Sequence, residues 1–161
     1  MRVGITGHRG LSMDVEDKVR GFLADRVQQY DPAGLVGVSC IADGSDSWFA
    51  QAVLRHGGRL EVVVPAAEYR ESLLDWHHPV HDPLLSRAAG VHHTGMTEST
   101  SQAHQTGSEI LRCGCCGRRA PDADGAFPPG VHSGVSSRNR RSWGYGLRTQ
   151  ADSWRVKPMW G

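Results

Sequence analysis

One run of residues near the middle of the chain most restricts its fold. Leu60 to Val64 is apolar except for Glu61 and is closed by Pro65, a pattern typical of a parallel strand covered by helices on both faces. Two further strand candidates precede it, at residues 2–5 and 34–41. Apolar side chains at helical spacing lie between the three runs, so the order is strand, helix, strand, helix, strand. This order predicts an α/β fold with a doubly wound, three-layer parallel sheet.

The two intervening helices have recognisable ends. Ser12 or Asp14 is the expected N-cap of the first, and Asp31-Pro32 stops it. The second begins near Asp46 and ends at Gly57-Gly58. Weaker signals follow Pro65: helical patterns at residues 69–74, 83–89 and 101–111, and a candidate short strand at residues 90–93.

Charge and apolar content divide the chain near residue 110. Residues 1–110 carry 14 acidic and 9 basic side chains, a net charge of −5, whereas residues 111–161 carry 3 and 9, a net charge of +6. Leu, Ile, Val and Phe number 26 in the first part and 6 in the second. We therefore expect a domain at residues 1–112, and a disordered basic tail at residues 113–161 that makes few apolar contacts with it.

Two polar, glycine-bearing loops follow the first two predicted strands. Ligands of open parallel sheets bind outside the carboxyl ends of the strands, where helix N-termini direct their amides. The candidate ligand-binding residues in these loops are Gly7, His8, Arg9, Asp43, Gly44, Ser45 and Asp46. Arg9 offers a planar fork for phosphate or carboxylate, and Asp43 is suited to a ribose hydroxyl.

Each loop also has a purely structural interpretation. Gly7 makes a turn on that interpretation, and Ser45 or Asp46 caps the following helix. The spacing Gly7-x-x-Gly10 is not the dinucleotide fingerprint, and no Gly-Lys-Ser/Thr sequence is present. These observations disfavour ordinary NAD-binding and ATP-hydrolysing proteins, and no cofactor is expected.

A family resemblance joins these motifs. The stretches Val3 to Arg9, Ala42 to Asp46 and Leu60 to Pro65, with the helix that ends in Gly57-Gly58, resemble the SLOG superfamily. That superfamily includes the DNA-processing protein A fold and the LOG-type nucleotide hydrolases. The resemblance covers residues 1–112 and implies a Rossmann-like domain that binds a nucleotide or nucleotide-derived ligand.

The resemblance extends to a Glu-Ser-Thr-Ser segment that also occurs in small actinobacterial proteins. Glu98, Ser99 and Thr100 precede the last predicted helix, so the resemblance adds them to the candidate ligand site. Capping of that helix is their structural alternative.

The C-terminal part departs from the SLOG pattern. LOG-type hydrolases carry their catalytic acid and phosphate-binding glycines in a region that residues 111–161 do not reproduce. We expect binding or sensing without catalysis, and keep nucleotide N-glycosidic hydrolysis and DNA binding of the DNA-processing type as alternatives. The Arg-, Gly-, Ser- and Cys-rich composition favours a shift of reading frame near residue 110, the rival being a genuine basic tail that binds nucleic acid. A sheet left incomplete exposes an apolar edge, which favours self-association.

Metal binding is not expected. Cys113 and Cys116 form one C-x-x-C, but structural zinc requires further ligands. His77, His78 and His81 surround Pro79 and are expected to form a polar surface cluster, and Cys40 a buried thiol. The sequence contains no apolar run long enough to cross a membrane and begins without a secretory signal, so a cytoplasmic location without membrane partners is expected.

Overall fold

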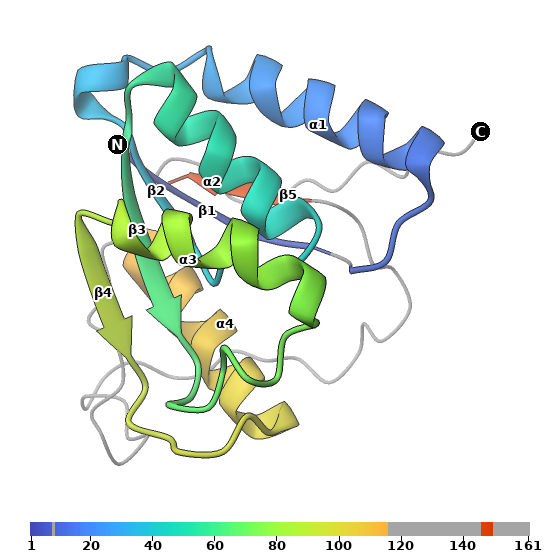
Figure 1. The fold of residues 1–161 in the computed structure, drawn as a ribbon. Coiled ribbons are helices and arrows are strands. Elements are labelled where there is room, and N and C mark those ends of the chain that lie inside the picture. Colours follow the sequence, from blue (N-terminus) through green and yellow to red (C-terminus); the bar gives the residue numbers. More distant parts are fainter. Residues whose placement is uncertain (8, 116–145, 150–161) are drawn as a thin grey trace, which may run out of the picture.

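Four parallel strands form the centre of the fold (Figure 1). A computed structural model describes residues 1–7, 9–115 and 146–149 of the chain. The strands are β1 (Arg2–Thr6), β2 (Val36–Ser39), β3 (Arg59–Val64) and β4 (Gly90–His93). They pair in the order β4-β3-β2-β1, with Val3 beside Gly37 and Gly37 beside Leu60. The predicted α/β class with a parallel sheet is confirmed.

Helices cover both faces of the sheet. Within the described ranges the α-helices are α1 (Met13–Val27), α2 (Ser45–His56), α3 (His78–Ser86) and α4 (Ser101–Cys115). Short 3-10 turns η1 (Pro32–Gly34) and η2 (Asp75–His77) precede β2 and α3. The helices α1 to α3 pack on one face and α4 on the other (Figure 1). This arrangement gives the predicted three layers.

Close packing of α2 on the sheet depends on Gly37 of β2. A Cβ added to Gly37 would lie 2.7 Å from Cγ2 of Val53 and 3.2 Å from Cε1 of Phe49. Both of these α2 side chains are fully buried. Glycine therefore allows α2 to approach the strand more closely than any other residue would.

A fifth strand lies beside β1. β5 (Gly146–Thr149) pairs antiparallel with it, from Val3 opposite Thr149 to Thr6 opposite Gly146. The sequence predicted no strand there and left this edge open, whereas β1 has a partner on each side. Residues 116–145 and 150–161 lie outside the described part, and the expectations of low order and few apolar contacts fall mainly on them.

The segment between β3 and β4 differs from its predicted form. Residues 69–74 form turns instead of a helix, and α3 begins at His78, five residues before the predicted start. Pro79 lies in the first turn of α3, where a missing N–H costs no helical hydrogen bond. Ala89 lies beyond the helix because its amide donates to Leu60 O at 2.7 Å. Within the described residues, no helix is long and apolar enough to cross a membrane.

Candidate functional site

The carboxyl ends of β1, β2 and β3 lie on the side of the sheet where α2, α3 and α4 begin (Figure 1). Three connecting segments meet there: the loop before α1, the loop before α2 and the turns after β3. The segment before α4 approaches the same edge, because Ala67 N donates to Met96 O and Glu68 N to Thr97 O. The topology thus gathers polar side chains from distant parts of the sequence.

An ion pair joins the first two loops. Nε of Arg9 donates to Oδ1 of Asp43. The Arg9 side chain remains 44% exposed, while that of Asp43 is 5% exposed. Asp43 therefore anchors one edge of the guanidinium, and within the described residues the two terminal nitrogens have no hydrogen-bond partner. Arg9 is held in place and still accessible.

Unusual backbone geometry shapes the loop between β2 and α2. Ile41 has φ of 48° and is fully buried, and Gly44 has φ of 93°. A β-branched residue with positive φ is strained. The Ser39 hydroxyl stabilises the bend, since it accepts from Ile41 N and donates to Asp46 O, both at 3.0 Å. The carbonyl of Ile41 is held separately by Nε2 of His77 at 3.0 Å.

Asp46 lies buried in the first turn of α2. Burial, and then the charge of Asp43, raise the pKa of Asp46 to about 7, against the opposing effects of Arg9 and a hydrogen bond from the Gly7 backbone. Asp43 and Asp46 thus differ: one is paired with a guanidinium, and the other titrates near neutral pH. Buried carboxyls whose pKa is shifted to near neutral are enriched at functional sites.

Aromatic rings and hydroxyls complete the cluster. The Tyr69 ring is buried, and His104 packs against it edge-on at 5.8 Å. Burial, followed by the electrostatic effects of Cys40 and Asp46, raises the pKa of Tyr69, so its hydroxyl stays protonated. Burial and then Arg9 lower the pKa of His104. Ser99 Oγ lies 2.8 Å from Nε2 of His104.

The structure brings together most of the predicted site. Six of the ten candidates lie at the two loops: Gly7, Arg9, Asp43, Gly44, Ser45 and Asp46. Ser99 lies beside His104, whose pKa is affected by the charge of Arg9. Glu98 and Thr100 are exposed, and Thr100 Oγ1 accepts from Ala103 N at 3.2 Å, so its structural role is to cap α4. His8 lies outside the described residues.

The capping interpretation of Ser45 and Asp46 is wrong. The N-cap position of α2 is Gly44, and no side chain makes a cap hydrogen bond there. Ser45 is fully buried, and its Oγ has no partner among the described residues. An unsatisfied buried hydroxyl beside a helix N-terminus is unusual in folded proteins.

Four aromatic or imidazole side chains near the site were not among the predicted site residues: Tyr69, His77, His81 and His104. The expectation of a polar surface cluster is wrong for His77 and His81, which are 1% and 2% exposed. Their rings lie 6.4 Å apart, and that of His81 lies 6.3 Å from Tyr69. Only the spacing of His77 and His81 gave a sequence signal, which predicts proximity but not burial.

The cysteine expectation is confirmed where the structure describes it. Cys40 is a buried free thiol, and burial raises its pKa well above the usual range. Across the described residues, no group of three or more His, Cys, Asp or Glu side chains is arranged to hold a metal ion. The side chains of Cys113 and Cys116 lie outside that part.

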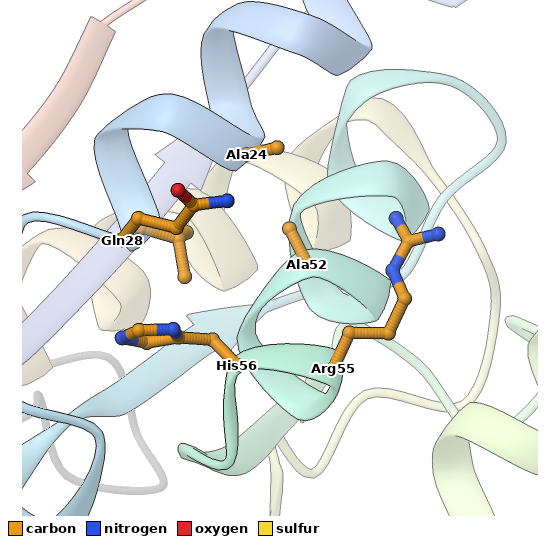
Figure 2. Close-up of a pocket in the computed structure, with 6 residues that line it drawn as sticks. Ala24, Gln28, Ala52, Arg55 and His56 are labelled. Atoms are coloured by element: carbon orange, nitrogen blue, oxygen red, sulfur yellow. The ribbon is translucent and has the colours of Figure 1, made fainter.

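A separate cavity lies at the other end of α2 (Figure 2). Its volume is about 290 Å³, and the C-terminal turns of α1 and α2 form its walls. The lining residues are Ala24, Val27, Gln28, Ala52, Arg55 and His56. His56 is held there by Nε2, which donates to Tyr30 O at 2.8 Å. None of these residues was predicted to bind a ligand.

The comparisons with known proteins add no relationship. The chain matches no protein-family model and no curated protein. The SLOG resemblance and its implied ligand therefore stay predictions.

Proposed function

We propose that the chain binds a nucleotide or nucleotide-derived ligand at the carboxyl edge of its parallel sheet. The observation that carries this proposal is the meeting of Arg9, Asp43 and the first turn of α2 at the ends of two adjacent parallel strands. In open α/β sheets this edge is where phosphorylated ligands bind.

The charges at the site suit a phosphate. Asp43 holds the Nε edge of Arg9 and leaves the terminal nitrogens for a ligand. A guanidinium held in this way binds phosphate oxygens through paired, charge-assisted hydrogen bonds. The N-terminus of α2, a helix of 12 residues, adds partial positive charge on the same side.

Asp43 also suits the sugar. Its buried carboxylate is orientated by Arg9 and keeps acceptor capacity for hydroxyl groups. The unpartnered hydroxyl of Ser45 provides a further polar contact in the adjacent turn. A phosphate and a hydroxylated sugar are thus favoured together, which is the chemistry of a nucleotide.

Nucleic acid is less suited to this edge. Residues 1–110 carry a net charge of −5, which opposes binding of a polyanionic backbone by the folded body. DNA affinity, if measured, is expected to depend on residues 111–161 and to vanish on their deletion.

Calorimetric titration of the full chain tests the proposal. AMP, a cyclic dinucleotide and ribose 5-phosphate serve as ligands, against the wild type, Arg9→Ala and Arg9→Lys. We expect saturable binding of at least one of them, weakened by Arg9→Ala by about 1–3 kcal/mol. Arg9→Lys keeps the positive charge but lacks the planar fork, so its ligand affinity should lie between those of the wild type and Arg9→Ala.

Arg26→Ala is the matched control. Arg26 is exposed in the last turn of α1, at the opposite end of that helix from the site. Its replacement should leave ligand affinity unchanged. Absence of saturable binding, or equal losses from Arg9→Ala and Arg26→Ala, contradicts the proposal.

A second candidate function is cleavage of a nucleoside monophosphate into free base and ribose phosphate. The observation that favours it is Asp46, a carboxyl beside Arg9 with a pKa of about 7. Such a group is suited to donate a proton to a leaving base at neutral pH. Release of free base from AMP by the full chain, lost in Asp46→Asn, supports cleavage; binding without release leaves the chain a binding protein.

A further inference from the structure

Three hydrogen bonds link His104 of α4 to the turns that follow β3. The Ser72 hydroxyl donates to the carbonyl oxygen of Tyr69 at 2.7 Å. Ser99 Oγ lies 2.7 Å from Ser72 Oγ and 2.8 Å from Nε2 of His104. The bonds form a chain that runs from a backbone carbonyl to the imidazole.

The direction of every bond follows from the carbonyl end. A carbonyl can only accept, so the single hydrogen of the Ser72 hydroxyl points to Tyr69 O. Ser72 then accepts the hydrogen of Ser99, which leaves Ser99 none to donate to His104. Nε2 of His104 must therefore carry a hydrogen and donate it to Ser99. Nδ1 is the remaining nitrogen, and it alone can gain a proton.

Other groups around the imidazole keep it neutral. The charge of Arg9, on the loop after β1, acts on the imidazole, and Tyr69 packs edge-on from the turns after β3. Asp43 pairs with Arg9, Asp46 lies buried in the first turn of α2, and the His81 ring lies 6.3 Å from that of Tyr69. Burial and then Arg9 lower the pKa of His104, so the free protein holds it uncharged at pH 7. Nδ1 has no hydrogen-bond partner within the described residues.

We propose that His104 is the second cation of the ligand site: a dianionic phosphate or sulfate that binds Arg9 causes Nδ1 to take a proton from solvent. The inference rests on the proposed function and names a residue that the sequence did not. The anion offsets the charge of Arg9 and attracts a further positive charge. Ser99 continues to accept from Nε2, so protonation breaks no existing hydrogen bond.

Binding linked to protonation becomes tighter as the pH falls. The limit is about tenfold per pH unit where one full proton is taken up. Sulfate is the cleanest probe, because it stays a dianion between pH 6 and pH 8, whereas the second pKa of a phosphate monoester is about 6. Any proton taken up with sulfate therefore enters the protein.

The experiment measures this proton directly. The full chain is titrated with sulfate, and separately with AMP, at pH 7.5 in two buffers that differ in ionisation enthalpy. We expect uptake of about half a proton to one proton per sulfate in the wild type. His104→Gln should abolish most of it, because the glutamine amide can donate to Ser99 as Nε2 does but cannot be protonated.

Asp46 also titrates near pH 7, so the variant Asp46→Asn tests whether Asp46 rather than His104 takes up the proton. The uptake should persist in Asp46→Asn if His104 receives the proton. Uptake that is lost in Asp46→Asn and kept in His104→Gln overturns the inference. Binding that depends on Arg9 without any proton uptake overturns it too, yet leaves the proposed function standing.

Nitrogen NMR of the imidazoles gives a readout that needs no nucleotide. The His104 signals, assigned by their loss in His104→Gln, should show hydrogen on Nε2 alone in the free chain and on both nitrogens in sulfate. If sulfate protonates His104 and no nucleotide binds, the inference holds and the proposed function fails. If sulfate leaves His104 neutral, the inference fails whatever nucleotides do.

Discussion

Nε2 of His77 donates a hydrogen bond to the carbonyl oxygen of Ile41, over 3.0 Å. Both residues are almost fully buried. Ile41 has the positive φ that begins the turn toward Asp43. A side chain on the turn before α3 thus stabilises a strained loop before α2, and that loop carries one half of the candidate site.

His77→Phe removes this donor while keeping an aromatic ring. The Ile41 carbonyl then loses its buried partner, which we expect to lower the free energy of unfolding by about 1–3 kcal/mol. Urea denaturation at pH 7.5 measures the loss. His78→Phe is the matched control, because His78 Nε2 makes a similar bond to Arg70 O, at 2.9 Å, on the exposed side. Equal losses in both variants would contradict the role of His77.

Asp46→Asn should change how stability depends on pH. The pKa of Asp46 is raised from 3.8 to about 7 in the folded chain. The folded state therefore binds the proton more tightly than the unfolded state, and the stability this provides is complete below about pH 4 and lost as the pH rises through 7. Asparagine does not incur that loss.

Denaturation of the two proteins from pH 4 to pH 8 measures the difference. Relative to the wild type, Asp46→Asn should gain about 2–4 kcal/mol over this range, at about 1.4 kcal/mol per unit of pKa shift. Asp25→Asn, an exposed replacement on α1, serves as the control. A constant difference between Asp46→Asn and wild type at all pH values would show that Asp46 does not titrate in this way.

Gly37→Ala tests the contact between β2 and α2. The added Cβ would lie 2.7 Å from Val53 Cγ2, so α2 must shift away from the sheet. We expect a loss of about 1–3 kcal/mol. Gly21→Ala is the opposite case: no atom lies within 4 Å of the added Cβ on α1, and a helix gains about 0.5–1 kcal/mol. Thermal unfolding should move in opposite directions for the two variants.

Ser39→Ala removes two buried hydrogen bonds from the same loop. Its hydroxyl joins Ile41 N to Asp46 O, and the residue is fully buried. Ile41 N would lose its buried partner and Asp46 O, within α2, one of the two hydrogen bonds it accepts, which should cost about 1–3 kcal/mol. Ser86→Ala removes one bond to Pro83 O on an exposed turn and should change stability little. Chemical denaturation distinguishes the two cases, and similar small losses would contradict this account.

Local patterns predicted the elements with strong signals. The run at residues 60–64 became β3, Gly57 took a left-handed conformation at the end of α2, and residues 90–93 formed β4. These features depend on residues that are neighbours in sequence. The turns at residues 69–74 were predicted as a helix because Tyr69 and Leu73 repeat at helical spacing. Both side chains are buried as that spacing implies, but the backbone between them turns.

Part of the site could be predicted from the order of the strands and helices. Arg9 and Asp43 follow predicted parallel strands, so topology alone indicates their proximity. His104 could not be found in this way. Its place depends on the packing of α4 against Tyr69 and on hydroxyls 5 and 32 positions away, Ser99 and Ser72. No periodicity in the sequence records such contacts, because they are made between surfaces that only the folded chain brings together.

The pairing of β1 on both sides has a consequence for hydrogen exchange. Alternate amides of a strand point to opposite neighbours, so those of β1 face β2 and β5 in turn. β2 follows in the next 40 residues of the chain, whereas β5 arrives from beyond residue 145. Opening of β5 alone would expose only every second amide of β1 to deuterium. The exchange rates along this one strand therefore report separately on the stability of its two edges.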